Sequence, residues 1–131
     1  MSAKLIRSLY EQRLAAWAAA RSLPVAWQNV SFTPPASGIY LRAFLLPATT
    51  DVPDLAGEYP IYRGVFQISI VAPSGQGSGA AEQLVEDLAV EFPADLLLTS
   101  GALSVMIVSP CSQGPAIQDS TSYMVPVSFT Y

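Results

Sequence analysis

The sequence predicts an α+β fold: a single domain over residues 1–131, with two main helices packed on a mixed, mainly antiparallel sheet of about four to five strands. Three observations support this prediction. A chain of 131 residues is long enough to bury a core and short enough to form one domain. Two segments repeat apolar residues at the helical period, and others alternate at the strand period. Their order is α-β-β-α-β-β, in which strand pairs separated by helices favour neighbouring antiparallel strands.

The first predicted helix runs from about Ala3 to Ser22, with Ser2 as its N-cap. Its apolar side chains share one arc of the helical wheel, and Leu23-Pro24 ends the helix. Arg13 falls near the middle of the apolar arc. Either its head extends along the surface into water, or it pairs with an acid of its own chain or of a neighbouring subunit.

Two strands are expected next. Val25 to Val30 predicts a short strand, and Ile39 to Leu46 predicts a longer one. Alternate residues of the longer strand form a wholly apolar face, while the opposite face carries Arg42 among large side chains. We expect this second face to be covered as well.

A long connection follows from Pro47 to Tyr62, and it carries three acidic residues, Asp51, Asp54 and Glu58. Structureless connections of this length are uncommon in a small domain and are usually functional. We therefore expect a partner contact in this segment.

Gly64 to Phe92 predicts a strand, a loop and a second helix in succession. The strand residues Val65 to Val71 are mostly β-branched or aromatic, and Pro73 with the glycines from Gly75 to Gly79 ends the strand. The helix that ends at Phe92 has one apolar face. The rest of its circumference is acidic and carries Glu82, Glu86, Asp87 and Glu91.

The glycine loop, Gly75-x-Gly77-x-x-Ala80, fits a loose dinucleotide-binding fingerprint. The chain is too short for two mononucleotide-binding halves, and the helix that would receive the phosphate is acidic without a nearby base. A plain connection is therefore favoured over phosphate binding.

The remaining third of the chain predicts strands around a turn. Pro93 to Gly101 predicts a turn with one helical turn around Ala94 to Leu98, and Leu103 to Ser109 predicts a strand. The last strand runs from Ser122 to Tyr131. It contains Pro126, which has no amide hydrogen and favours an edge strand or a bulge.

Charged residues make up only 12% of the chain, while 51% of residues are hydrophobic. Such a surface either is covered by uncharged polar residues or is buried against other subunits, and we favour the second. Residues 1–63 hold all six basic residues and four acids, a net charge of +2, whereas residues 64–131 hold six acids and no base, a net charge of −6. This asymmetry indicates either two solvated faces or head-to-tail association between copies.

Several chemistries are disfavoured by composition. The chain has no histidine, which excludes Cys-His and Ser-His-Asp catalysis within one subunit, and its single cysteine, Cys111, cannot form an internal disulfide. We expect no catalytic residue, no metal site and no cofactor. No apolar run approaches a membrane span, and no patch is basic enough for direct or sequence-specific DNA binding. We also expect no signal peptide, because charges are spread through the first 22 residues.

The whole plan resembles the tail terminator family of long-tailed bacteriophages and prophages, the minor tail protein U-like proteins. Beyond the long first helix, the resemblance rests on these segments: Pro34-Pro35 leading to Tyr40-x-Arg42, Gly64-x-Phe66-Gln67-Ile68 leading to Pro73-x-Gly75, the acidic helix ending at Phe92, and Val125-Pro126-Val127-Ser128-Phe129-x-Tyr131. It covers nearly the full length.

The resemblance implies a small structural protein that is not an enzyme. Such proteins form a hexameric ring on the end of the tail tube, stop its polymerisation and present a surface to the head-completion protein. They reside in the host cytoplasm before assembly and in the virion tail afterwards. The alternatives are another head-tail joining or tail-tube component, a small enzyme or nucleotide-binding regulator, and a stand-alone ligand-binding module. As assembly contacts we predict Arg13, Arg42, Arg63, Asp51, Asp54 and Glu58.

Overall fold

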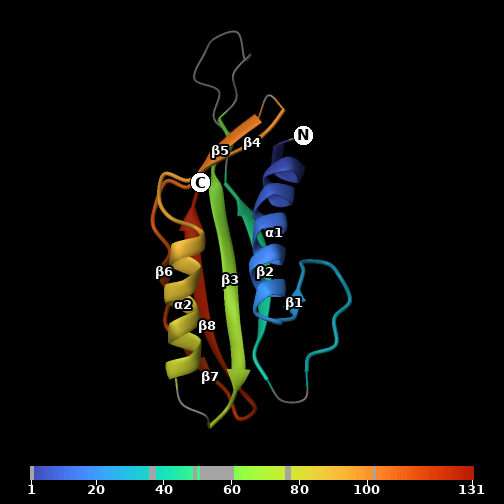
Figure 1. Cartoon of the computed structure of the whole chain (residues 1–131), viewed down its shortest axis with the longest axis vertical. Helices are drawn as coiled ribbons and strands as arrows, with labels where there is room; N and C mark the ends of the chain where they lie inside the picture. The colour runs from blue at the N-terminus through green and yellow to red at the C-terminus, as the bar shows by residue number, and fades with distance from the viewer. Residues whose placement is uncertain (1, 36–37, 49, 51–60, 76–77, 102) are drawn as a thin grey trace.

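A computed structural model describes residues 2–35, 38–48, 50, 61–75, 78–101 and 103–131 (Figure 1). Its helices are α1 (Ser2–Ala20) and α2 (Gly79–Glu91). Its strands are β1 (Val25–Ala26), β2 (Tyr40–Pro47), β3 (Gly64–Pro73), β4 (Leu97–Ser100), β5 (Leu103–Met106), β6 (Ser112–Gln113), β7 (Ile117–Gln118) and β8 (Ser122–Thr130). The α+β class is confirmed, and both predicted helices form.

The main sheet is mixed and mainly antiparallel, as predicted. Its strand order is β1-β2-β3-β8-β6, and β7 also pairs with β8. Among the strands that the structure describes, only β1 runs parallel to its neighbour, pairing with β2. This sheet has six described strands, and β4 and β5 form a separate hairpin. The predicted count of four to five strands is therefore too low. The predicted order α-β-β-α-β-β is incomplete, because it leaves out the short strands.

The core lies between the two helices and one face of the sheet. β3 is the central strand, and its register aligns Ile68 with Ala43 of β2 and Val127 of β8 on the inward face. Both helices contribute to the same buried cluster as these residues, through Tyr10 of α1 and Leu88 of α2 among others. A single face of the sheet therefore carries both helices.

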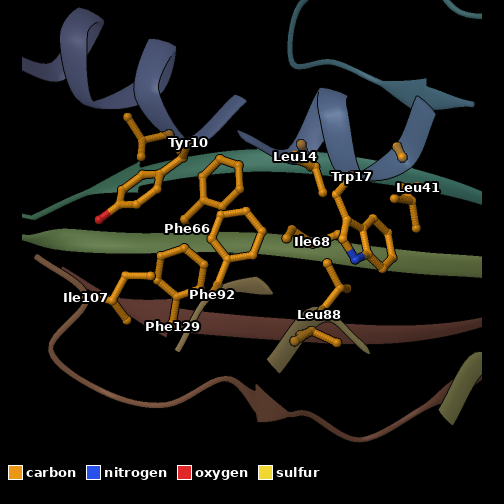
Figure 2. Close-up of a cluster of buried hydrophobic side chains, with 14 of the residues drawn as sticks. Tyr10, Leu14, Trp17, Leu41, Phe66, Ile68, Leu88, Phe92, Ile107 and Phe129 are labelled. Atoms are coloured by element: carbon orange, nitrogen blue, oxygen red, sulfur yellow. The ribbon is translucent and has the colours of Figure 1, made fainter. Parts of the chain in front are cut away.

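Aromatic rings fill one part of this core (Figure 2). The Tyr10 ring lies 5.4 Å from Phe66, 5.1 Å from Phe129 and 6.4 Å from Phe92, measured between ring centroids. Tilted and edge-to-face pairs of this kind add to the stabilisation that burial provides. The cluster joins α1, β3, β8 and the end of α2.

The predicted helical turn around Ala94 to Leu98 is wrong, because Leu97–Ser100 is strand β4. β4 pairs with β5 along its whole length, and Gly101 turns the chain with a φ of 61°. The amide of Ile107 also donates to the carbonyl of Leu96, which extends the hairpin. Pairing with β5, which comes later in the chain, therefore makes Leu97–Ser100 a strand rather than a helical turn.

Pro126 does not mark an edge strand, because β8 lies between β3 and the short strands β6 and β7. The carbonyl of Pro126 accepts from the amide of Gly114, so the proline nitrogen faces the connection between β6 and β7. At this position the pairing of β8 is interrupted between β6 and β7, so no strand needs an amide hydrogen from residue 126. A proline is therefore tolerated inside the sheet.

The second face of the sheet is covered only in part, contrary to the sequence prediction. Phe32 packs on Tyr40 with ring centroids 5.3 Å apart, but Arg42 and Leu46 on the same face of β2 are exposed. Leu46 keeps 47% of its surface accessible. An apolar surface therefore remains uncovered in the single chain.

Candidate assembly surfaces

Exposed apolar side chains gather at one end of the molecule, which we call the apolar end. It is formed by the start of α1, the end of β2, the start of β3 and the β4–β5 hairpin (Figure 1). Among the described residues, six large apolar side chains that are at least 36% exposed belong to these segments or lie within three residues of them: Leu5, Leu46, Ile61, Leu97, Met106 and Val108. Exposed patches of this kind usually mark interaction sites.

A hollow of about 950 Å³ opens at the apolar end. Ile61, Arg63, Met106, Val108 and Tyr131 are among the residues that line it. The lining comes from the start of β3, the hairpin and the end of the chain, so residues distant in sequence build one apolar surface.

Close packing holds the floor of the hollow in place. The amide of Tyr131 donates to the carbonyl of Gly64 over 3.0 Å. A β-carbon at Gly64 would lie 2.5 Å from the Tyr131 hydroxyl oxygen and 2.7 Å from the carbonyl oxygen of Leu46. Only glycine allows this approach, and the last residue of the chain is thereby fixed against β3.

Tyr10 places an unpaired hydroxyl beneath the same end. Its side chain is fully buried, and its hydroxyl oxygen has no hydrogen-bond partner among the described residues. Figure 2 shows the hydroxyl pointing away from Phe66 and Phe92. Burial, with a contribution from Tyr131, raises the pKa of Tyr10, so the hydroxyl stays neutral.

Arg13 takes the second of its two predicted roles, pairing with an acid, and the acid belongs to its own chain. Its Nε donates to the backbone carbonyl of Glu91 over 2.9 Å and lies 3.5 Å from the Glu91 carboxylate. Arg21 makes a similar link to Asp87, 3.9 Å away. Arg13 lies on α1 and Arg21 directly follows it, so both contacts hold this segment against α2. About a third of the Arg13 side chain stays accessible for a further contact.

The other predicted residues lie apart from Arg13. Arg42 is exposed on the second face of the sheet, with its guanidinium carbon 5.3 Å from the centre of the Phe44 ring. Arg63 lines the hollow at the apolar end. The three arginines therefore occupy three separate places, while Asp51, Asp54 and Glu58 lie outside the described residues.

The outer edge of β2 is closed within the chain. The amide of Leu41 donates to the carbonyl of Pro24, and the amide of Leu45 donates to Oε1 of Gln28 over 3.1 Å. Arg7 donates to the same Oε1 over 2.6 Å, and Pro47 has no amide hydrogen. Partners that add a strand need free edge groups, so this edge is protected from such pairing.

Cys111 is a free, partly buried cysteine. The Cys111 thiol faces the carbonyl oxygens of Leu88 and Phe92, and burial raises its pKa to about 11. A protonated thiol is a poor nucleophile.

The described residues hold no group of three or more His, Cys, Asp or Glu side chains placed to bind a metal ion. Of the glycine loop, Gly75, Ser78, Gly79 and Ala80 are described. No helix among the described residues has the length and apolarity needed to cross a membrane.

Sequence reasoning missed the apolar end. A signal was present, because Met106 and Val108 occupy the same face of a strand whose other face is also apolar through Val105 and Ile107. Apolar residues on both faces of a hairpin predict that both faces are covered. In the single chain Val105 and Ile107 are buried, whereas Met106 and Val108 are exposed by 44% and 63%.

Comparisons with known proteins identify the family. The family model for phage tail terminator proteins matches residues 5–131. A solved structure 48% identical in sequence superposes with a TM-score of 0.84, covering 99% of this chain and 94% of the other. No curated protein matches the sequence. The suspected resemblance is thus confirmed: the chain belongs to the phage tail terminator family and is a structural protein of the phage tail.

Proposed function

We propose that this protein forms a hexameric ring on the end of the tail tube, stops tube polymerisation and presents the interface to the head-completion protein. The observation that carries this proposal is the apolar end, where Ile61, Met106 and Val108 stay exposed around an apolar hollow. A ring places the same end of every copy on one side, so one partner meets all of them at once.

The energetics favour a ring over a single copy. Full burial of one large apolar side chain contributes about 1.5–3 kcal/mol, and the exposed side chains here are already partly covered. A single copy therefore gains only a modest contact free energy after the cost of association. In a ring, several copies contact the tube at once, and binding of one copy raises the effective concentration of the others at the tube end. A ring can therefore stay bound to a tube end from which a monomer would dissociate.

The two ends of the molecule differ, as a coupler between two partners requires. Opposite the apolar end, β3 turns toward α2 at Ser74 and Gly75, and Asp119 with Ser120 leads into β8 (Figure 1). These residues are polar or small. We assign the apolar end to the tail tube and this polar end to the head-completion protein.

We include four of the six predicted charged contacts in this proposal. The segment that carries Asp51, Asp54 and Glu58 leaves β2 after Pro47 and enters β3 at Gly64, both at the apolar end. Arg63 follows this segment in sequence and lines the hollow. We propose these four residues as polar contacts around the apolar tube interface, where charge sets orientation more than affinity.

A tube-growth assay tests the proposal. Purified tail-tube protein is polymerised with and without this chain, and tube lengths are measured by negative-stain imaging. The chain should stop growth, and the double substitution Met106→Ser with Val108→Ser should abolish the effect while the circular dichroism spectrum is retained. Ile117→Ser is the matched control, because Ile117 is 55% exposed on β7, away from the apolar end. Tubes of unchanged length with the unsubstituted chain would refute the proposal.

The hollow also favours a second candidate, a stand-alone module for an apolar ligand. Its volume of about 950 Å³ falls within the range of small-molecule sites, roughly 300–1,000 Å³. Titration with an apolar fluorescent probe decides between the two. Tight binding of the probe by a chain that does not associate with tail tubes supports the module, whereas displacement of the probe by tubes assigns the hollow to the tube interface.

A further inference from the structure

The two halves of the sequence form two sides of the molecule. α1, β1 and β2 lie on one side of the central strand β3, while α2, β6 and β7 lie on the other (Figure 1). β3 itself carries no charged residue. The basic side chains of the described elements belong to the first side, and the acidic face of α2 belongs to the second. Charge is therefore separated in space as well as in sequence.

Much of this charge is already paired inside the chain. The ion pairs join Arg7 to Glu11, Arg13 to Glu91 and Arg21 to Asp87. Glu82 and Glu86 on α2, and Arg42 on β2, form no ion pair with any described residue. These three exposed charges remain available on opposite sides of the molecule.

The exposed face of α2 combines the two free carboxylates with one apolar side chain. Glu82, Glu86 and Val90 follow at intervals of four residues, so they lie along one helix face. Val90 is 80% exposed, more than any other large apolar side chain described. Val90 therefore contributes nothing to the core of the isolated chain.

The opposite side of the molecule offers a groove of about 360 Å³ with matching chemistry. It lies between the segment after β1 and the second face of β2. Arg42 lines it beside Phe44, and Trp27, Val30 and Phe32 form part of its apolar wall. Val30 is 59% exposed. Gln28 and Asn29 also line it, so the groove presents one positive head among aromatic, apolar and amide side chains.

We propose that the Glu82–Glu86–Val90 face of α2 docks into the Arg42 groove of a second copy of this chain. The inference rests on the proposed ring and assigns its subunit contact. Charge complementarity supports it, because the carboxylates meet Arg42 while Val90 meets apolar walls. The two surfaces lie on opposite sides of one subunit, as a head-to-tail contact that closes into a ring requires. A two-fold dimer through either surface would instead bring like charges together.

Thiol cross-linking tests the contact directly. In a Cys111→Ser background, Val30→Cys and Val90→Cys are made singly and together, and a short bismaleimide is added with and without tail tubes. The doubly substituted chain should give a series of linked oligomers ending at the ring. The two single variants, mixed, should give only dimers, and neither alone should link. Ile117→Cys combined with Val30→Cys is the control and should not link efficiently.

Charge exchange provides an independent readout. Arg42→Glu and the pair Glu82→Arg with Glu86→Arg should each weaken self-association at least about tenfold. One chain carrying all three substitutions restores the attraction at every contact and should recover association. Equal weakness of the combined variant, together with no link between positions 30 and 90, would overturn the proposal.

The outcomes separate this inference from the proposed function. Rings that cap tubes but link through other positions would refute the contact and keep the terminator function. A ring linked between positions 30 and 90 that leaves tube length unchanged would keep the contact and refute the terminator function.

Discussion

Arg13 Nε donates to the backbone carbonyl of Glu91 over 2.9 Å, although 78 residues separate them in sequence. The contact satisfies a carbonyl in the last turn of α2, where helices leave such groups without intrahelical partners. The same guanidinium lies 5.9 Å from the centre of the Phe92 ring. One arginine of α1 thus fixes the end of α2 to the core.

Replacement of Arg13 by alanine should lower the free energy of unfolding by about 1–2 kcal/mol, since a charged hydrogen bond is lost at a partly exposed site. Urea denaturation followed by circular dichroism measures the change. Lys4→Ala is the matched control and should leave stability within about 0.5 kcal/mol, because Lys4 is exposed and lies outside the proposed subunit contact. Unchanged stability with lost assembly would instead make Arg13 a contact to a neighbouring subunit.

Gly64→Ala should destabilise the fold by about 1–3 kcal/mol, because its β-carbon would overlap Tyr131 and the backbone of Leu46. Thermal unfolding of the variant gives the value. Gly79→Ala serves as control: no heavy atom lies within 4 Å of its added β-carbon, and the helix propensity gained there makes it neutral or slightly stabilising. A Gly64→Ala chain as stable as the parent would show that the chain end is not held against β3.

Tyr10→Phe should be neutral or stabilising by about 1 kcal/mol, because it removes a buried hydroxyl that has no partner among the described residues. The ring and its packing on Phe66 remain. Chemical denaturation of the isolated chain is the measurement. If the free energy of unfolding fell by more than about 1 kcal/mol, the hydroxyl would have to form a hydrogen bond that is absent among the described residues.

Stability should fall in alkaline solution. Burial raises the pKa of Tyr10 and of Tyr131 above their ordinary value of 10.0, so folding favours the neutral phenols. A raised pKa contributes stability that is fully present below pH 10 and is lost as the pH rises toward the folded pKa. Denaturation curves between pH 8 and pH 11 should therefore show a decline that begins near pH 10 and is smaller in Tyr10→Phe.

The alkaline experiment belongs in a Cys111→Ser background. Burial raises the pKa of Cys111 from 9.0 to about 11, which gives a stability loss of the same sign in the pH range from 9 to 11. Equal declines in the parent and in Tyr10→Phe would contradict the assignment of the effect to Tyr10.

The long periodic elements could be predicted from the sequence, because their patterns are local. Both helices and the strands around Phe44, Phe66 and Val127 follow from apolar spacing alone. The strands β4, β6 and β7 are two to four residues long, too short for a pattern, and pairing partners fix them. The interior place of Pro126 depends on a gap between two such strands.

The assembly surfaces were harder to predict than the fold. The charge asymmetry was visible in the sequence, yet only the sheet order shows that it separates two sides of the molecule. Which arginines are engaged internally also depends on tertiary contacts, as Arg13 and Arg42 show. The apolar end brings Ile61, Met106 and Tyr131 together from distant segments, and no local pattern encodes that proximity.

Imaging of capped tube ends by cryo-electron microscopy tests the central claim most directly. The account predicts one ring of six copies at the tip, with Met106 and Val108 of every copy facing the tube and Ser74 with Asp119 facing away from it. A tip without a ring, or a ring that meets the tube through the polar end, would contradict it.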